Sequence, residues 1–167
     1  MRKEIFMILS LGLAMTGLAK EKIEVVGARA SAVYKEYQAS NAIDGVISDK
    51  SRWVGVKDEY GKIWLALEFK QKSSVSSFQL YSGRGKTDAI DSFHVEIKNQ
   101  SGEWVKVPGS AVSKNKSIQR EVVFEAPVTV KELRVMITKT LGDIARVKEV
   151  VLYSDTPSKS KKRILTI

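Results

Sequence analysis

The sequence predicts an all-β protein of about eight strands that folds as a two-sheet β-sandwich or jelly roll. Short runs of residues alternate between hydrophobic and polar side chains, and clusters of Gly, Ser, Asn, Asp and Lys separate these runs. Alternation with a period of two places every second side chain on one face of a strand. About eight such runs, evenly spaced along one chain, are typical of two packed antiparallel sheets. Helical patterns are scarce, and no internal repeat is present.

The inward-facing positions of the runs are apolar and recur at every second residue. The runs lie at residues 23–26, 65–69, 78–80, 93–97, 105–107, 122–124, 133–137 and 150–152. Trp53 follows a polar stretch and Trp64 begins an alternating run, so we expect both in the core or at its rim. Trp104 follows a turn, and we expect it at a sheet edge.

Residues 1–19 have the features of a secretory signal peptide. Arg2 and Lys3 provide a positive start, an apolar run follows, and small residues at the end form a cleavage site after Ala19. We therefore expect residues 20–157 to form the mature domain in an extracytoplasmic location, either secreted or periplasmic. An uncleaved membrane anchor is the alternative, although the apolar run is shorter than the roughly 20 residues that a span needs.

The chain carries a net charge of +9, from 28 basic and 19 acidic residues, and it contains no cysteine. Four of the basic residues lie in a C-terminal tail, residues 158–167, so the domain itself is only modestly basic. A face that binds a polyanion is one interpretation of these charges, and solvated lysines scattered over the surface are the other. We expect no nucleic-acid binding and no membrane insertion. Without disulfides, stability must come from the core and from any metal that the fold binds.

A polar stretch from residue 37 to residue 53, YQASNAIDGVISDKSRW, has the composition of a cation-binding loop. Its oxygen-bearing side chains, which lie close together in the sequence, include Asn41, Asp44, Asp49 and Ser51. Ca²⁺ is bound by several oxygen atoms from carboxylates and carbonyls. Gly45 allows a tight turn beside Asp44. The alternative is an ordinary surface loop with an Asx turn at these two residues.

Four segments resemble the discoidin domains, which are also called coagulation factor five/eight C-type domains. They are ASNAIDG and SRW in this loop, the following WLALEF, and ARVKEVVLY near the C-terminus. The resemblance extends over about residues 28–153, and the relatives of this family include galactose-binding-like carbohydrate-binding modules. It implies the jelly-roll fold, ligand binding by loops, and one structural Ca²⁺.

In ion-binding members of this family, an Asp side chain, carbonyls around it, a Ser or Thr later in the loop and a Glu that opens the last strand hold the ion. Carried over to this sequence, the implied ligands are Asp44, the carbonyls of Asn41 and Val46, Ser51, the carbonyl of Lys148, and Glu149. Such an ion would tie an early loop to the last strand and would stabilise the folded state by mass action.

Candidates for the ligand-binding site come from three further loops. Arg84 and Asp88 lie in a glycine-containing loop, where a planar guanidinium suits recognition of hydroxyl or carboxylate groups. In sugar-binding members of the family an Arg commonly follows the same strand. Tyr60 lies in a polar loop, where exposure is expected. Arg146 completes the set, and the alternative for it is an ion pair with a carboxylate near Glu149.

The sequence offers little for catalysis, and we predict that the protein is not an enzyme. Its one histidine, His94, alternates with Phe93 and Val95 and should face outward, and no phosphate loop or paired-histidine motif is present. A Ser-His-Asp triad would have to use His94, and no nucleophile turn lies nearby. A two-carboxylate glycosidase is left open by the residues alone. Relatives often carry a His where this chain has Phe93, so the family's polar set for galactose is incomplete.

Two hypotheses about function follow. The first is an exported, non-catalytic carbohydrate-binding module with a structural calcium site, which binds a glycan or polysaccharide through loops and serves a partner enzyme or a cell-surface component. The second is a cell-envelope or extracellular adhesion protein that binds an anionic polysaccharide or a protein, with the basic tail contributing. Charge-driven binding weakens steeply with ionic strength, whereas stacking on a neutral sugar changes little, so salt distinguishes them.

Overall fold

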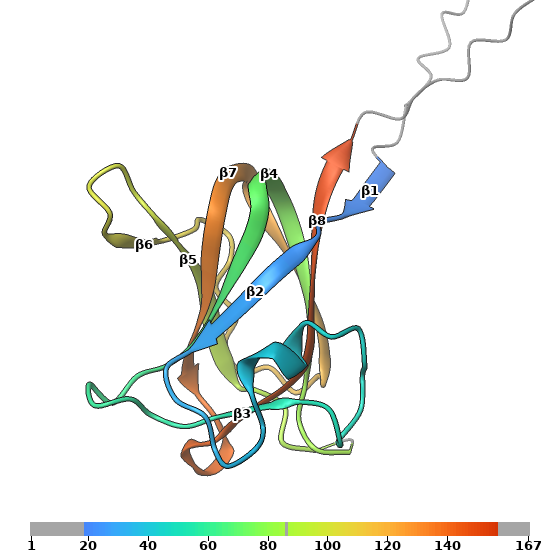
Figure 1. The fold of residues 1–167 in the computed structure, drawn as a ribbon, viewed down its shortest axis with the longest axis vertical. Coiled ribbons are helices and arrows are strands. Elements are labelled where there is room, and N and C mark those ends of the chain that lie inside the picture. The colour runs from blue at the N-terminus through green and yellow to red at the C-terminus, as the bar shows by residue number, and fades with distance from the viewer. Residues whose placement is uncertain (1–18, 86, 157–167) are drawn as a thin grey trace, which may run out of the picture.

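The computed structural model describes residues 19–85 and 87–156. The expected basic tail and all but the last residue of the expected signal peptide lie outside these ranges. Eight strands and two short 3-10 helices make up the described part of the chain (Figure 1), namely β1 (Ala19–Lys22), β2 (Val25–Ala30), η1 (Ala39–Ala42), β3 (Trp53–Gly55), β4 (Ile63–Ser82), β5 (Ser92–Lys98), β6 (Trp104–Lys106), β7 (Gln119–Lys139), η2 (Leu141–Asp143) and β8 (Ala145–Thr156). No helix in this part of the chain has the length and hydrophobicity needed to cross a membrane.

The strands pair antiparallel throughout, in the order β1-β8-β4-β7-β5-β6, with β2 beside β4 and β3 beside β8. The long strands β4 and β7 run side by side through both layers. Their register shifts between Glu68 and Ser73 and again between Val75 and Ser77. Because such irregularities bend a strand and increase its twist, one continuous sheet curls over the core as two layers. The predictions of an all-β class and eight strands are confirmed.

The strand boundaries differ from the expected runs in two ways. The runs at 65–69 and 78–80 belong to the single strand β4, and those at 122–124 and 133–137 belong to β7. The short strands β1 and β3 were not expected. Val105 was expected to face inward like Val107, but it is 39% exposed whereas Val107 is buried. The β5-β6 hairpin projects from the sandwich (Figure 1), so Val105 on β6 is only partly covered.

The core lies between the two layers and contains the apolar side chains that the alternation predicted. Leu65, Leu67 and Phe69 are fully buried, and Phe78 lies at the centre, with ring centroids 6.1 Å from both Phe93 and Phe124. Burying side chains of this size stabilises the fold by about 1.5 to 3 kcal/mol each. The core therefore provides the rigid frame on which the loops are held.

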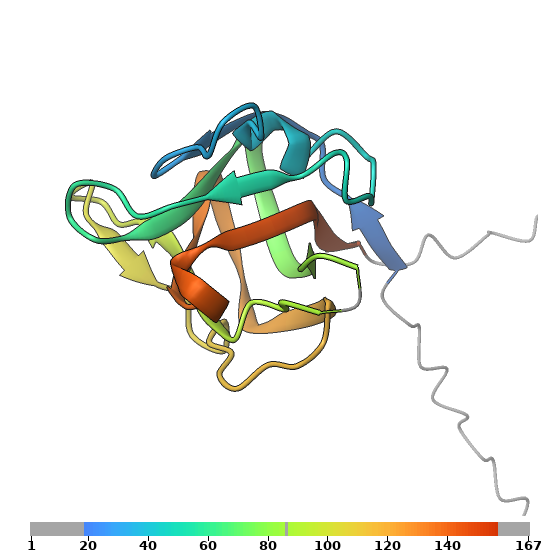
Figure 2. The same ribbon diagram turned by 90° about the horizontal axis from the view of Figure 1, so that it is seen from below.

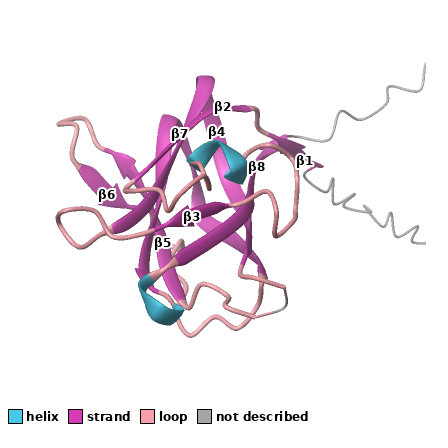
Figure 3. Cartoon of the chain, turned by 60° about the horizontal axis from the view of Figure 1, so that its bottom comes forward, coloured by secondary structure: helices cyan, strands magenta, loops and turns pink. Residues whose placement is uncertain are grey.

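The polar loops gather at one end of the sandwich, opposite the end where β1 and β8 lead to the termini (Figure 1). Seen from that end, η1 lies beside β3, which pairs with β8 (Figures 2 and 3). Trp53, at the start of β3, is fully buried beneath these loops, and its indole N–H donates to the carbonyl of Ala32. The expectation of Trp53 in the core is confirmed, and Trp104 lies partly exposed on the edge strand β6 as expected.

Candidate functional site

A pocket of about 260 Å³ opens between the loops at this end, and we call it the loop-end pocket. Four segments that are distant in sequence line it, with the residues Tyr34, Lys35, Glu36, Tyr37, Arg52, Val54, Arg84, Ile144 and Arg146. Four of these residues are cationic and one is acidic, so the lining has a strong positive excess. The structure therefore brings together two of the predicted ligand-binding residues, Arg84 and Arg146.

Arg84 is held by its backbone and leaves its side chain free. The N–H of Gly83 donates to the carbonyl of Arg146 at 2.9 Å, and the N–H and carbonyl of Arg84 bond to Thr87. Gly83 has a φ of +88°, and a Cβ there would lie 2.2 Å from the carbonyl oxygen of Thr87, so only glycine fits this turn. The Arg84 side chain is exposed and belongs to none of the ion pairs found within the described residues. Its guanidinium is thus available to a ligand at a fixed position.

A second anchor fastens the same loop to the polar stretch before β3. The carboxylate of Asp49 accepts from the N–H of Gly85 at 2.9 Å and lies 3.1 Å from Nζ of Lys148, which in turn donates to the carbonyl of Gly85 at 3.4 Å. The Lys148 ammonium, followed by the N–H of Gly85, lowers the pKa of the Asp49 carboxyl. Asp49 therefore stays ionised and joins three segments at the wall of the pocket.

The remaining arginines of the loop-end pocket are held by acidic partners. Arg52 is buried, contacts the Asp49 carboxylate at 3.4 Å, and places its guanidinium 5.0 Å from the ring of Tyr37. Nη1 of Arg146 lies 3.7 Å from Oδ2 of Asp88, and both side chains are about one fifth exposed. The predicted residues Asp88 and Arg146 are thus neighbours, and Arg146 pairs with Asp88.

The aromatic residues beside the pocket differ from the one singled out in the sequence. Tyr34 is 43% exposed and lies under the ammonium of Lys35 at 5.2 Å, and Tyr37 lies under Arg52. Tyr60 is 77% exposed on the loop before β4, and it is absent from the described residues that line this pocket. Its loop approaches η2 instead, where Lys57 pairs with Asp143 at 3.0 Å.

The side chains predicted to bind calcium also converge. The Asp44 carboxylate accepts from the N–H of Val46 at 2.8 Å and from the hydroxyl of Ser51, and the N–H of Gly45 donates to Oε2 of Glu149 at 3.1 Å. Glu149 is only 3% exposed. Burial, together with the charge of Asp44, raises the pKa of the Glu149 carboxyl.

The donor set at this position fits a hard cation. Two carboxylates and a hydroxyl oxygen meet at the junction of the loop with β8, and the buried Glu149 has one N–H donor, Gly45, as its hydrogen-bond partner among the described residues. No three His, Cys, Asp or Glu side chains cluster within those residues, so carbonyls would complete the coordination. The resemblance assigned these to Asn41, Val46 and Lys148.

Two of the three backbone positions have side chains that are engaged elsewhere. The amide of Asn41 donates to the carbonyl of Arg52 at 3.2 Å, and the side chain of Lys148 is bonded to Asp49 and Gly85. The strand register pairs Tyr81 with Glu149 and Ser82 with Val147, which places Lys148 in a β-bulge. The backbone around Glu149 is therefore released from regular pairing next to the acidic side chains.

Comparison of the sequence with known protein families identifies the family to which this fold belongs. The sequence profile of the F5/8 type C domain matches residues 27–150. The chain belongs to the F5/8 type C domain family. This match spans the polar stretch, the loop of Arg84 and the first half of the last strand, and it confirms the resemblance to the discoidin domains. Comparison with curated proteins finds no significant match.

Solved structures share the F5/8 type C fold at low sequence identity. The family 32 carbohydrate-binding module of C. perfringens NanJ, determined with galactose, has a TM-score of 0.66 and 22% identity, and the alignment covers 81% of this chain and all of that one. A pectin-binding carbohydrate-binding module has a TM-score of 0.62 and 20% identity, over 80% and 94% of the two chains. The AlyQ module, determined with 4,5-unsaturated mannuronic acid, has a TM-score of 0.62 and 16% identity, over 79% and 97%. The predicted jelly-roll fold is thereby confirmed.

Sequence reasoning missed three features of this F5/8 type C domain. Asp49 was grouped with the cation-binding oxygens, whereas it pairs with Lys148 and Arg52. Tyr34 and Tyr37 were not proposed as ligand contacts. The signal was nevertheless present, because Tyr34 lies in a polar loop between strands, the same criterion that selected Tyr60.

Proposed function

We propose that this domain is a non-catalytic carbohydrate-binding module that binds a carboxylate-bearing sugar of a glycan or polysaccharide in the loop-end pocket. The observation that carries the proposal is the exposed guanidinium of Arg84, which has no ionic partner within the described residues and lies on a backbone that is fixed on both sides. A guanidinium donates two parallel hydrogen bonds to a carboxylate, and fixing it beforehand reduces the entropy lost on binding.

The other residues of the pocket have complementary roles in this proposal. Tyr34 offers an aromatic face to the apolar side of a sugar ring, and Lys35 adds positive charge next to it. Arg146 donates to hydroxyl groups while Asp88 holds it in place and accepts. Tyr60 is kept as a proposed contact for a longer ligand, because its loop lies at the same end of the sandwich. Such shallow sites bind with micromolar to millimolar Kd, about −8 to −4 kcal/mol.

The relatives support a sugar ligand without fixing which one. The NanJ module was determined with galactose, the second module binds pectin, and the AlyQ module was determined with an unsaturated mannuronic acid. Two of these three ligands are or contain acidic sugars, in keeping with the positive excess of this chain's pocket.

We further propose a structural Ca²⁺ held by Asp44, Ser51, Glu149 and the carbonyls of Asn41, Val46 and Lys148. When bound, the ion supplies the positive charge that offsets two neighbouring carboxylates, one of them buried. Asp44 and Glu149 would then be tied together across the junction of the loop and β8. Export from the cytoplasm, with cleavage after residue 19, is the third part of the proposal and rests on the N-terminal sequence.

The test of the ligand is a calorimetric comparison of galacturonate with galactose, its neutral counterpart, at low and high salt. We expect galacturonate to bind more tightly, and its affinity to fall as ionic strength rises, because the contact is an ion pair near the surface. Equal affinities for the two sugars, or an acidic sugar whose binding is independent of salt, would contradict the role given to Arg84. Incubating the pure protein with a galacturonate-containing polysaccharide tests the non-catalytic assignment, because cleavage of that polysaccharide would contradict it.

A further inference from the structure

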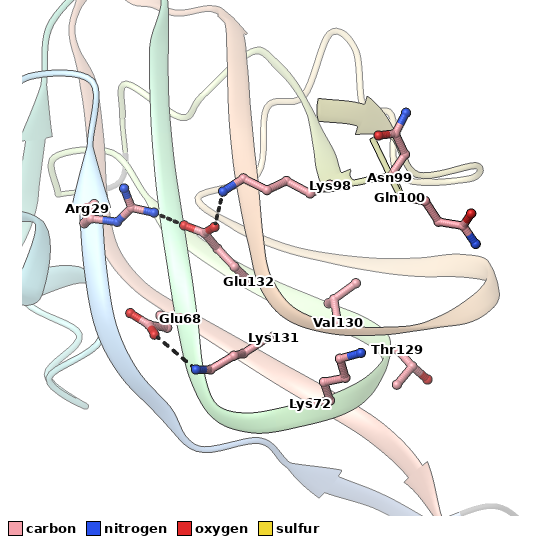
Figure 4. A pocket seen from close by; sticks show the side chains of 10 residues that line it. All are labelled: Arg29, Glu68, Lys72, Lys98, Asn99, Gln100, Thr129, Val130, Lys131 and Glu132. Carbon is pink, nitrogen blue, oxygen red and sulfur yellow. Dashed lines mark hydrogen bonds and ion pairs between the residues drawn. The ribbon is translucent and has the colours of Figure 1, made fainter. Parts of the chain in front are cut away.

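A second, larger groove lies on the strands, away from the loop end. It has a volume of about 680 Å³, within the range of about 300 to 1,000 Å³ that small-molecule sites occupy. We call it the strand-face groove, and its residues are Arg29, Glu68, Lys72, Lys98, Asn99, Gln100, Thr129, Val130, Lys131 and Glu132 (Figure 4). Its lining comes from β2, β4 and β7 and from the turn of the β5-β6 hairpin, and it includes no residue of the loop-end pocket.

Two cations of this groove are held in fixed positions by one carboxylate. Glu132 of β7 accepts from Arg29 of β2 on one side and from Lys98 of β5 at 3.0 Å on the other (Figure 4). The ammonium of Lys98 also lies 5.0 Å from the ring of Trp104. Glu132 is largely buried, whereas the side chain of Arg29 is 64% exposed. Both cations are therefore positioned in the free protein and still have donor N–H groups to offer.

The other two cations have little or no compensating charge. Nζ of Lys131 lies 3.9 Å from Oε1 of Glu68, at the limit of an ion pair, and both side chains are more than half exposed. Lys72, in the irregular part of β4, takes part in none of the ion pairs within the described ranges 19–85 and 87–156. With four cations and two carboxylates, the groove has an excess of positive charge along its length.

The uncharged lining indicates which kind of anion fits. Asn99, Gln100 and Thr129 present amide and hydroxyl groups, and Val130 is the one apolar residue among those that line the groove. A peptide would need apolar pockets for its side chains or a free strand edge, as in the common modes of peptide recognition. A polyhydroxylated chain with carboxylates needs cations and amide groups, which this groove offers.

We propose that the strand-face groove is a second binding site, for a segment of an acidic polysaccharide that carries carboxylates on successive sugars. Lys72 and Lys131 contact the carboxylates on one side, Arg29 and Lys98 those on the other, and the amides of Asn99 and Gln100 bind hydroxyl groups. Binding of a segment in this groove does not depend on the loop-end pocket binding a sugar. The groove and the loop-end pocket share no residue, so if the loop end binds a sugar as proposed, one protein molecule can hold two polysaccharide segments at once.

The experiment is a titration of the ¹⁵N-labelled protein with short galacturonate oligomers, followed by NMR. The backbone amide signals of Asn99, Gln100 and Thr129 should shift. The double variant Lys72→Glu, Lys131→Glu should abolish these shifts or raise the Kd at the groove at least about tenfold. The reason is that this variant replaces two attractive surface contacts with repulsive ones. The signals of Gly83 and Gly85 at the loop end should respond equally in the parent and in this variant.

A second double variant serves as a matched control, because it changes the net charge by the same amount as Lys72→Glu, Lys131→Glu. Lys70 lies in the same segment as Lys72 but does not line the strand-face groove, and Lys106 is exposed on β6. The double variant Lys70→Glu, Lys106→Glu should keep the groove shifts. The inference is overturned if the groove signals do not move, whether or not those of Gly83 and Gly85 do, or if both double variants lose binding equally. It is also overturned if poly-glutamate shifts the groove signals with the same affinity, because the site would then recognise charge alone.

Discussion

Nζ of Lys148 lies 3.1 Å from Oδ1 of Asp49, and this ion pair connects the last strand to the polar stretch before β3. The same carboxylate accepts from the N–H of Gly85, so the loop that carries Arg84 is fixed by the pair. Lys148 and Glu149 are consecutive in β8, one bonded to Asp49 and the other to the N–H of Gly45. The start of β8 therefore contributes one residue, Lys148, to the support of the proposed sugar site and the next, Glu149, to the proposed calcium site.

Replacing Asp49 by Ala should destabilise the protein and loosen the Arg84 loop. The side chain of Lys148 is only 10% exposed, and leaving it without its carboxylate should cost about 1 to 3 kcal/mol. The free energy of unfolding from denaturant titration measures this loss. As a control, Lys57→Ala removes the exposed pair with Asp143 and should change stability by less than about 0.5 kcal/mol. Equal effects of the two substitutions would contradict the anchoring role of Asp49.

The pH dependence of the Asp49 anchor has a defined sign. The pKa of Asp49 is lowered in the folded state, so its contribution is present above the carboxyl's ordinary pKa of 3.8 and is lost as the pH falls through the folded-state pKa. We therefore expect the difference in stability between the parent and Asp49→Asn to shrink below pH 4. A difference that stays constant down to pH 2 would show that the ion pair contributes nothing.

Glu149→Gln should have opposite effects with and without calcium. The folded-state pKa of Glu149 is raised, so the folded state holds the proton more tightly and loses stability as the pH rises from the ordinary value of 4.5 through the raised pKa. Without calcium at pH 7, the variant should therefore melt at the same temperature as the parent or higher. With calcium at a hundred times its Kd, the free energy of unfolding of the parent should rise by about 2.7 kcal/mol, and that of the variant should not change.

The control for the calcium prediction is Glu125→Gln, which changes an exposed carboxylate outside the site. This variant should gain as much stability from calcium as the parent does. Calcium stabilisation that persists unchanged in Glu149→Gln and in Asp44→Ala would mean that no ion binds at this position.

The alternation of apolar residues predicted the core because burial follows directly from side-chain direction in a strand. Leu65, Leu67, Phe78 and Phe93 all lie where that periodicity placed them. The partners of Lys148 could not be predicted in this way, because a β-bulge interrupts the register at that residue and its partner Asp49 lies 99 positions earlier. Pairing between distant loops depends on how the loops fold over the sheet, which local sequence does not encode.

The resemblance to a family supplied what periodicity could not. It assigned Asp44, Ser51 and Glu149 to one set of ligands, and these side chains do converge. It also indicated Arg84. It did not indicate Tyr34, which reaches the pocket because the loop of residues 31–38 folds next to Arg52 and Arg146.

The aromatic contact of the sugar site distinguishes Tyr34 from Tyr60. Tyr34 borders the loop-end pocket, so Tyr34→Ala should weaken binding of galacturonate by about tenfold, or 1.4 kcal/mol. Tyr60 projects from a neighbouring loop, so Tyr60→Ala should have an effect of less than about twofold on a single sugar, and a larger one only on a longer oligomer. Calorimetry with the monosaccharide and the oligomer measures both. The reverse order of effects on the monosaccharide would place the aromatic contact at Tyr60.

The most direct test of the proposed function is the affinity of Arg84→Ala for galacturonate, measured by calorimetry beside Arg120→Ala. Arg120 is also exposed but lies outside the loop-end pocket, so both variants lose the same charge from the surface. We predict that Arg84→Ala lowers the affinity at least about tenfold, with unchanged melting temperature, and that Arg120→Ala binds as the parent does. Binding by Arg84→Ala that equals that of the parent would contradict a carbohydrate site in the loop-end pocket.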